Sequence, residues 1–137
     1  MGRMFQKFIL EWFLANQVLL RGIDCILPIP LHPARLFSRG YNQAVYLLNK
    51  QKLITVDTKA LEKKSWTAQQ AGKSKKERMA NLKNAFKVTK DLSKIKILLF
   101  DDVCTTGQTL SEVSRILRKE GVKHIDALVL CRSLKII

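Results

Sequence analysis

The segment from Ile97 to Thr109 combines two carboxylates with a run of small and hydroxyl-bearing residues, Thr105-Thr-Gly-Gln-Thr109. Such a run lets backbone N–H groups approach a phosphate closely, and a helix that begins near Leu110 would direct its positive end toward the anion. Asp101 and Asp102 would be repelled by that phosphate unless they faced neutral donors, such as two neighbouring ribose hydroxyls. The spacing therefore predicts a site for a sugar phosphate.

Other interpretations of the same segment are weaker. The chain contains neither G-x-x-x-x-G-K-[ST] nor G-x-G-x-x-G, which disfavours Walker-type nucleotide hydrolysis and dinucleotide binding. Phosphate-accepting receiver domains also place an acidic pair at a strand end, but near the start of the domain, whereas this pair comes about three quarters of the way along. The remaining alternative is a strand that ends in a solvated acidic turn.

The elements around this segment predict a βαβ unit. Ile95 to Phe100 is a nearly continuous apolar run, as expected of an inner parallel strand. Leu110 to Glu120 has a helical apolar face, Gly121 occupies the position of a helix C-cap glycine, and Val122 to Cys131 contains another strand. We expect a mainly parallel α/β sheet, with the candidate site beyond the carboxyl ends of its strands.

The N-terminal part supplies further elements. The apolar stripe of Met4 to Leu20 predicts a helix packed on the core; attachment to a membrane surface is the alternative, disfavoured by the few cations on its other face. Expected next are a buried strand at Asp24 to Pro30, a basic loop at Leu31 to Gly40, a helix at Asn42 to Lys50 and a short strand at Leu53 to Val56. A helix is expected at Lys75 to Asn84, and a half-buried strand at Ala85 to Val88.

The charge of the chain is unusual for one domain of 137 residues. Its formal net charge is +14, and the stretch from Lys59 to Lys96 holds twelve basic residues and three acids, a net charge of +9. Two interpretations explain this stretch equally well: a lysine-rich solvated surface, and a groove for polyphosphate or nucleic acid. The charge favours anionic partners and does not determine the fold.

The cysteines predict no disulfide framework and no zinc site. Cys25, Cys104 and Cys131 lie far apart and form no C-x-x-C pair, so a reducing cytoplasm is the expected location. We expect Cys25 and Cys131 to be core strand residues and Cys104 to be a tolerated small loop residue. The apolar runs are too short to span a membrane, and no signal peptide is recognisable.

Ile97 to Leu110 looks like the phosphoribosyl-pyrophosphate signature of type I phosphoribosyltransferases, and the wider chain resembles the ComF family, also called the GntX-type or amidophosphoribosyltransferase-like group. Further matching pieces, in order, are Pro28-Ile-Pro-Leu-His32, Arg39-Gly-Tyr-Asn-Gln43, Thr67 with Gln70, and Glu77-Arg78 with Asn81 before Ala85-Phe86. The resemblance implies a single α/β domain over residues 1–137, with a mainly parallel sheet flanked by helices. Within it lie an N-terminal helix (1–21), a basic flexible loop (59–84) and the phosphoribosyl-pyrophosphate motif (97–110).

The resemblance also implies roles for individual residues. Asp101 and Asp102 would bind the ribose 2′ and 3′ hydroxyls, and the basic loop would close over the site, with Arg78 as a catalytic cation. The remaining substrate-binding residues would be Val103, Cys104, Thr105, Thr106, Gly107, Gln108 and Thr109 around the 5′-phosphate, and His32, Arg35, Arg39 and Lys76 around the pyrophosphate. Mg²⁺ would arrive bound to the pyrophosphate, without a dedicated protein site.

Members of this family commonly begin with a cysteine-rich zinc-binding segment, which Met1 to Arg21 does not supply. We therefore expect a shortened member or a chain that starts inside a longer ancestral protein. The hood that selects the acceptor in such enzymes could be built here only from the N-terminal helix and irregular pieces.

Two functions from different classes follow. One is a Mg²⁺-dependent phosphoribosyltransferase that transfers phosphoribosyl to an unidentified nitrogen acceptor. The other is a non-catalytic competence module that senses phosphoribosyl pyrophosphate or a nucleotide, binds single-stranded DNA through the +9 segment, and works with other competence proteins.

Overall fold

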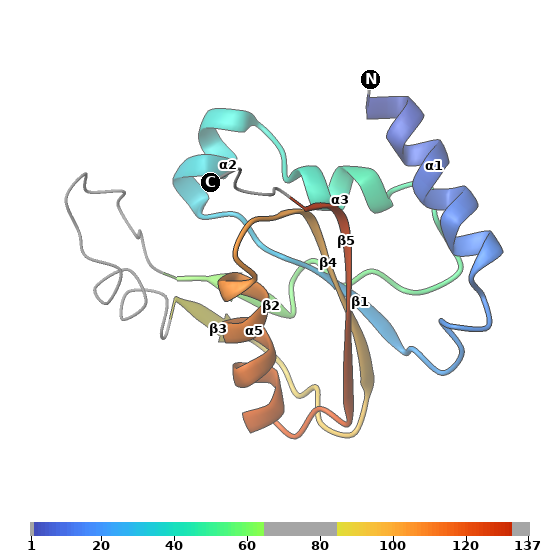
Figure 1. The fold of residues 1–137 in the computed structure, drawn as a ribbon. Helices are drawn as coiled ribbons and strands as arrows, with labels where there is room; N and C mark the ends of the chain where they lie inside the picture. The colour runs from blue at the N-terminus through green and yellow to red at the C-terminus, as the bar shows by residue number, and fades with distance from the viewer. Residues whose placement is uncertain (1, 65–84, 133–137) are drawn as a thin grey trace.

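A parallel three-stranded sheet forms the centre of the protein. The structure, a computed structural model, describes residues 2–64 and 85–132. The sheet consists of β1 (Cys25–Pro28), β4 (Lys96–Cys104) and β5 (His124–Arg132), with β4 between the other two (Figure 1). The predicted inner strand and the βαβ connection from β4 to β5 are thus confirmed.

Side chains alternate along the strands and divide the core into two layers, because successive residues of a strand point to opposite faces. On β4, Ile97 and Leu99 join one buried cluster, whereas Leu98 and Phe100 join the other. The near-continuous apolar run of β4 is therefore that of a strand covered on both faces.

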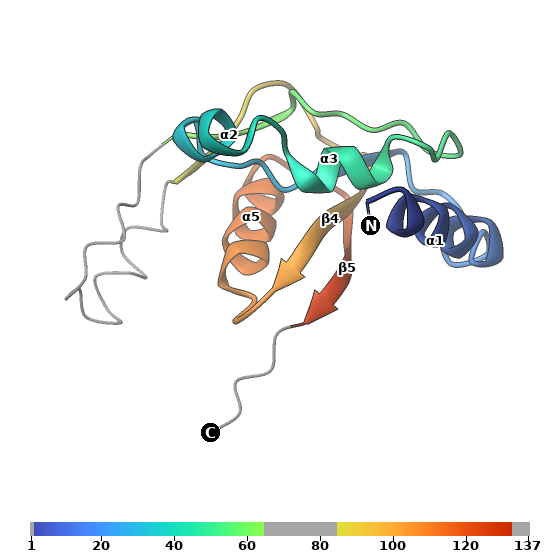
Figure 2. The ribbon, with the colours of Figure 1, turned by 90° about the horizontal axis from the view of Figure 1, so that it is seen from above.

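Different elements cover the two faces of the sheet (Figure 2). On one face lie α5 (Gln108–Lys119) and the antiparallel pair of β2 (Leu61–Lys63) and β3 (Phe86–Val88). On the other face, α1 (Gly2–Ala15) contributes Ile9 and Phe13, and α3 (Gln43–Leu48) contributes Ala44 and Leu47 to the core.

The predicted N-terminal helix forms but ends at Ala15, before Leu20. The Asn16 side-chain amide and its backbone N–H both bind the Trp12 carbonyl, at 2.8 and 3.0 Å, and a series of turns follows. Asn side chains compete in this way with the regular helical pattern. Leu20 still reaches the core from these turns.

Hydrogen bonds fix the position of α3 against α1. The Gln6 side chain of α1 donates to the Tyr46 carbonyl at 2.7 Å. Asn42 caps α3 by accepting the N–H of Ala44 at 2.9 Å, and its own side-chain amide donates to the Ile29 carbonyl at 3.0 Å. The predicted helix in this region is confirmed, with Asn42 as its cap.

The C-terminus of α5 has a Schellman motif. Gly121, at φ +78°, donates to the Arg118 carbonyl, and Val122 donates to the Leu117 carbonyl. Leu117 and Val122 lie in the same buried cluster, as the motif requires. The predicted C-cap role of Gly121 is confirmed.

The prediction of a loop at Leu31 to Gly40 was wrong, because Pro33–Arg39 forms the helix α2. Pro33 begins the helix, where its fixed φ is favourable and its missing N–H costs nothing, and Gly40, at φ +78°, ends it. Two shorter assignments also change. Only Val56 of the expected strand bridges to Ile26, and β2 occupies the start of the segment predicted to be a flexible loop (59–84).

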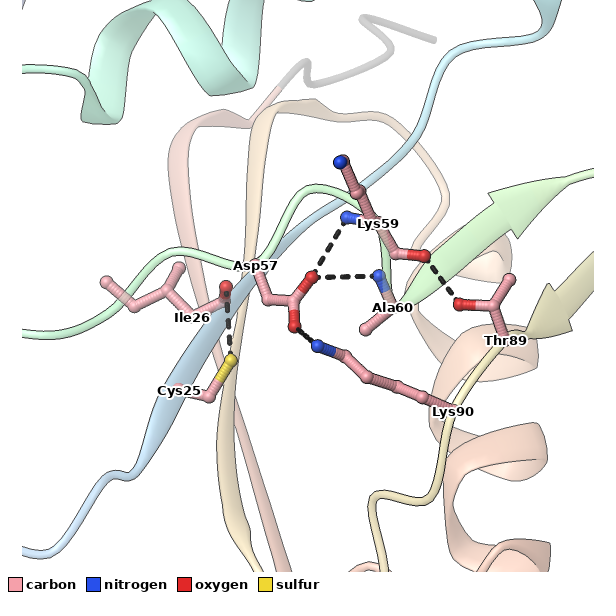
Figure 3. Close-up of polar contacts among 7 residues, drawn as sticks. All are labelled: Cys25, Ile26, Asp57, Lys59, Ala60, Thr89 and Lys90. Atoms are coloured by element: carbon pink, nitrogen blue, oxygen red, sulfur yellow. Dashed lines mark hydrogen bonds and ion pairs between the residues drawn. The ribbon is translucent and has the colours of Figure 1, made fainter.

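A polar cluster joins the β2–β3 pair to the sheet (Figure 3). Asp57 accepts the backbone N–H groups of Lys59 at 2.9 Å and Ala60 at 3.0 Å, and it forms an ion pair with Lys90. Thr89 donates to the Lys59 carbonyl. Burial alone would raise the pKa of Asp57, but the bond from Lys90 and the two backbone donors outweigh it and lower the pKa.

The cysteines are free, but they differ in exposure. Cys25 is buried beside this cluster, and burial raises the pKa of its thiol, which makes it a poor nucleophile at neutral pH. Cys131 is exposed, so its prediction as a core residue was wrong. It lies on β5 near the end of the strand, beyond the buried part of the sheet. Among the described residues, no helix is long and apolar enough to cross a membrane.

Candidate functional site

The two carboxylates lie inside β4, at its carboxyl end, not in the turn after it. β4 continues to Cys104 because β5 is long enough to pair with it, with Asp101 opposite Val129 and Cys104 opposite Arg132. The acid pair therefore has the fixed backbone of a strand, which holds side chains more precisely than a turn does.

The Asp101 side chain is half-buried, and its pKa is shifted from the ordinary value. Burial, followed by the negative charge of the neighbouring Asp102, raises its pKa to about 6. A ligand that donates hydrogen bonds to the ionised form of such a carboxyl group would stabilise that form and lower its pKa again.

The loop after β4 forms a small polar cavity with Asp101. Asp101, Val103 and the residues from Cys104 to Leu110 line about 40 Å³, far less than the 300–1,000 Å³ typical of whole-ligand pockets. Only one group of a ligand can enter it. All the residues predicted for the 5′-phosphate thus come together here.

The N-terminus of α5 opens onto this loop. Gly107 is the N-cap residue, at φ +76°, a backbone conformation that favours glycine, and no side chain caps the helix. The Thr106 hydroxyl accepts a long bond from the Gln108 N–H at 3.4 Å. The N–H groups of Thr109 and Leu110, also in the first turn of α5, are thus available to an anion, and this turn contains no acid to compete with it.

Basic residues also lie on α2 and just before it. The Ile29 N–H donates to the Phe100 carbonyl of β4 at 2.8 Å, which fixes the chain entering α2. Arg35 and Arg39 of α2 are exposed. His32, which is half-buried, precedes α2, and its carbonyl accepts the Leu36 N–H of the first helical turn.

Lys63, at the end of β2, was not singled out from the sequence. Burial lowers its pKa, the positive charge of Arg35 lowers it further, and Asp101 acts in the opposite direction. Its Nζ lies 5.4 Å from the centre of the Phe86 ring. Arg35, Lys63 and Asp101 are therefore gathered at one end of the fold. The sequence signal that could have identified Lys63 is its spacing of two residues from apolar Leu61, because residues two apart lie on the same face of a strand.

Two predicted site residues, Lys76 and Arg78, lie outside the described residues, as do the expected helix at Lys75 to Asn84 and the motif pieces Thr67, Gln70 and Asn81. Within residues 2–64 and 85–132, no group of three or more His, Cys, Asp or Glu side chains is placed to hold a metal ion.

Comparison with known proteins establishes the family of this chain and the class of its fold. Residues 34–135 match the family described as phosphoribosyl transferase domain, and the chain belongs to that family. Within it, the curated relatives are competence proteins and DNA utilization proteins, which confirms the resemblance to the ComF group.

One relative is competence protein F of Haemophilus influenzae, 40% identical over 117 residues, covering 80% of this chain and 51% of that protein. DNA utilization protein YhgH of Escherichia coli K12 is 33% identical over 114 residues, covering 81% and 50%. The chain spans about half the length of the curated relatives it matches.

Solved structures agree on the fold. A hypoxanthine-guanine phosphoribosyltransferase from Bacillus anthracis superposes with a TM-score of 0.57 at 14% identity, covering 100% of this chain and 75% of that one. A purine phosphoribosyltransferase from Pyrococcus horikoshii gives 0.54 at 19% identity, covering 96% and 77%. These likenesses confirm the predicted fold class, the type I phosphoribosyltransferase fold.

Proposed function

We propose that this domain binds 5-phosphoribosyl 1-pyrophosphate and transfers the phosphoribosyl group to a nitrogen acceptor, with release of pyrophosphate, in a process linked to DNA uptake. The observation that carries the proposal is the single polar cavity shared by Asp101 and the loop at the uncapped N-terminus of α5. The family match and the competence relatives support the same class of ligand and process.

Each part of the ligand has a matching group. The first-turn N–H groups of α5 and the hydroxyls of Thr105, Thr106 and Thr109 would hold the 5′-phosphate. Asp101 and Asp102 would accept hydrogen bonds from the ribose hydroxyls.

Cations from α2 and β2 border the end of the fold that the pyrophosphate would occupy. The C1′–O bond would break with its electron pair leaving on the pyrophosphate, while the acceptor nitrogen forms the new bond to C1′ and loses a proton. Arg35, Arg39 and Lys63 would stabilise the charge that develops on the leaving group, and we expect Lys76 and Arg78 to add to this.

Mg²⁺ fits the proposal as a partner of the substrate. It prefers oxygen ligands and keeps several waters, so the pyrophosphate oxygens would carry it, and there it would neutralise part of the leaving group's charge. The chain's own contribution is to position the sugar and exclude alternative orientations.

Calorimetric titration with phosphoribosyl pyrophosphate and Mg²⁺ tests the proposal. We expect binding by the wild type and about 100-fold weaker binding by Asp101→Ala/Asp102→Ala, since hydrogen bonds to charged groups contribute about 1.5–3 kcal/mol each. The matched control is Asp91→Ala/Asp126→Ala, which removes the same charge from exposed positions elsewhere. Absence of binding, or equal affinities for the acid-pair variant and the wild type, would refute the proposal.

A second candidate function is binding of single-stranded DNA. It is favoured by the names of the relatives, which refer to competence and DNA utilization, and by the basic segment, whose described part includes exposed Lys64 and Lys87. Cations that track a phosphate backbone release its counterions, so such binding weakens steeply with salt.

Fluorescence anisotropy with a labelled oligothymidylate tests this candidate at several salt concentrations. For Lys64→Ser/Lys87→Ser, the plot of log affinity against log salt should become shallower by about 1.4, from a contribution of about 0.7 per phosphate contact. Lys119→Ser/Lys123→Ser, near the amino end of the sheet, should behave as the wild type. Affinity that does not depend on salt, or the same slope in all three proteins, would exclude the candidate.

A further inference from the structure

The strand β5 forms an open edge of the central sheet (Figure 2). One side of β5 pairs with β4, and within residues 2–64 and 85–132 no strand pairs with its other side. The opposite edge strand, β1, differs, because its Ile26 N–H donates to the Thr55 carbonyl at 2.8 Å and its Ile26 carbonyl accepts the Asp57 N–H at 2.9 Å. Alternate peptide groups of β5 therefore point away from the sheet and can pair with a strand of another chain.

The sequence of β5 lacks the features that usually protect an edge strand. Such strands are commonly short, or they carry a lysine or a proline. β5 is nine residues long, and its central residues, Ala127-Leu-Val-Leu-Cys131, are all apolar and uncharged. A long apolar edge of this kind is suited to strand addition.

Apolar surface continues from β5 onto α1. Phe5 and Phe8 of α1 line a mostly apolar cavity of about 410 Å³ beside Asp102, together with Leu130 and Cys131 of β5. The Phe8 side chain is 55% exposed. Exposed apolar surface next to an open strand edge is typical of a protein interaction site.

The charge of this edge restricts the kind of partner. The segment from Asp126 to Arg132 has one acid and one base, a net charge of zero, whereas the whole chain carries +14. A neutral edge on a basic protein does not favour nucleic acid or an acidic peptide. It favours a strand that places an acid opposite Arg132 and a base opposite Asp126.

A second copy of β5 has this pattern of charges. In an antiparallel pair with its two-fold axis at Val129, Asp126 lies opposite Arg132 of the second copy, and the contact occurs twice. Leu128 lies opposite Leu130 between these contacts. All four even-numbered residues share the α1 side of the sheet, because Leu128 and Leu130 pack against the core cluster on that side and side chains alternate along a strand.

The neighbouring register of the same pair is less favourable. With the two-fold axis at Leu128, Arg132 would lie opposite His124, and Asp126 would lie opposite apolar Leu130. Both ion pairs would be lost. The charges therefore select the register centred on Val129.

We propose that two copies of this chain form a dimer by antiparallel pairing of β5 with β5, with Asp126 of each copy opposite Arg132 of the other. The pairing joins the two three-stranded sheets into one continuous sheet. This inference goes beyond the proposed function, because all residues around the small cavity of Asp101 belong to one chain. The interface is small, so we expect a dissociation constant on the order of 10 μM.

Sedimentation equilibrium of the full chain tests the proposal, at about 1 to about 200 μM protein in about 0.3 M salt, which screens the repulsion between two basic copies. A reducing agent prevents the exposed thiol of Cys131 from linking copies covalently. The wild type should be mostly a monomer at the lowest concentration and mostly a dimer at the highest.

Charge-swap variants test the register. Asp126→Arg and Arg132→Asp should each raise the dissociation constant of the dimer about tenfold, because two like-charge contacts replace two ion pairs. The combined variant Asp126→Arg/Arg132→Asp should return it to within about threefold of the wild type. Arg132→Asp is the cleaner single variant, because it leaves the contact of His124 Nε2 with Asp126 Oδ2, at 3.0 Å, in place. Lys123→Asp is the matched control, since it changes the charge equally at an exposed residue just before β5.

Cross-linking provides a second measurement of the register. Ala127 lies opposite Cys131 of the second copy, and opposed residues of an antiparallel pair have Cα atoms about 4.5–5.5 Å apart, within the range of a disulfide. Under mild oxidation, Ala127→Cys should therefore form a covalent dimer on a non-reducing gel. Lys123→Cys, which places a thiol at an exposed position outside β5, should form much less.

The results separate as follows. A wild type that stays monomeric at every concentration would overturn the proposal. The same conclusion would follow from equal dissociation constants for Arg132→Asp and Lys123→Asp, from a combined swap that does not restore the dimer, or from equal cross-linking of the two cysteine variants. Weakening by each single swap, restoration by the combined swap and selective cross-linking of Ala127→Cys would support it, with far-UV circular dichroism verifying that each variant keeps its fold.

Discussion

Asp101→Asn is expected to make the protein more stable at neutral pH and at the same time to weaken the proposed binding of phosphoribosyl pyrophosphate. Asp101 has a pKa raised to about 6 by burial and by Asp102, compared with an ordinary value of 3.8. The folded state therefore prefers the protonated form. Asparagine is neutral at every pH and has nearly the same shape, so it removes the unfavourable charge.

The direction of the pH dependence follows from these two values. The favourable contribution of the protonated carboxyl is complete below about pH 3.8 and is lost as the pH rises through about 6. Above pH 7 the variant should exceed the wild type by about 1–2 kcal/mol in free energy of unfolding, after discounting the shift for partial exposure of the group.

Urea unfolding at pH 7.5 and pH 4.5 provides the measurement for Asp101→Asn, and the advantage of the variant should shrink at the lower pH. Calorimetry at pH 7.5 should show a loss of affinity of about tenfold, because an amide accepts hydrogen bonds from ribose hydroxyls less strongly than a carboxylate does. A variant that is less stable than the wild type at pH 7.5 would contradict this account of Asp101.

Asp57→Ala is expected to destabilise the protein strongly, whereas Asp101→Asn stabilises it at neutral pH. It leaves Lys90 without its ion pair and the N–H groups of Lys59 and Ala60 without their acceptor. The loss should amount to about 1–2 kcal/mol in free energy of unfolding, since the exposed N–H of Lys59 and the partly buried N–H of Ala60 lose their acceptor and half-exposed Lys90 loses its ion-pair partner. The β2–β3 pair should detach first, because this cluster ties it to the sheet.

The pH dependence of the Asp57 contribution has the opposite sign to that of Asp101. The pKa of Asp57 is lowered, so its contribution is present above its ordinary pKa of 3.8 and is lost as the pH falls through the lowered value. Thermal unfolding of Asp57→Ala and wild type at pH 7 should therefore differ widely, and the difference should narrow in acid. Asp91→Ala is the control, since exposed Asp91 also accepts a backbone N–H, from Ser93 at 2.8 Å, and should cost less. Equal losses in both variants would refute the special role of Asp57.

The sequence predicted the centre of the fold well because its signals there are local and strong. The apolar run of β4, the helical stripe of α5 and Gly121 each specify one element, and their order specifies a parallel sheet. The candidate phosphate site was predicted from residue types alone, and the structure places Asp101 and the loop from Cys104 to Leu110 around one cavity; its ligand stays a prediction.

The parts that sequence patterns missed depend on tertiary contacts. α2 has no buried stripe to reveal it, since most of its residues are exposed. β2 has three residues, too few for a periodic pattern, and its lysines resembled those of the basic segment around it. Lys63 became a candidate only when β2 placed it near Arg35 and Asp101. Similarly, only the packing of α1 against the sheet creates the cavity beside Asp102.

The position of the acid pair within a strand limits how this segment can change in length. Inserting or deleting one residue of β4 before Asp101 would exchange the faces of the two carboxylates, because side chains alternate. The group beside the loop from Cys104 to Leu110 would then point toward α1, and its neighbour toward α5. A change of length after Cys104 alters only the loop. A redesign of the loop proposed to bind phosphate should therefore place insertions between Cys104 and Gly107 and preserve the spacing from Ile97 to Asp102.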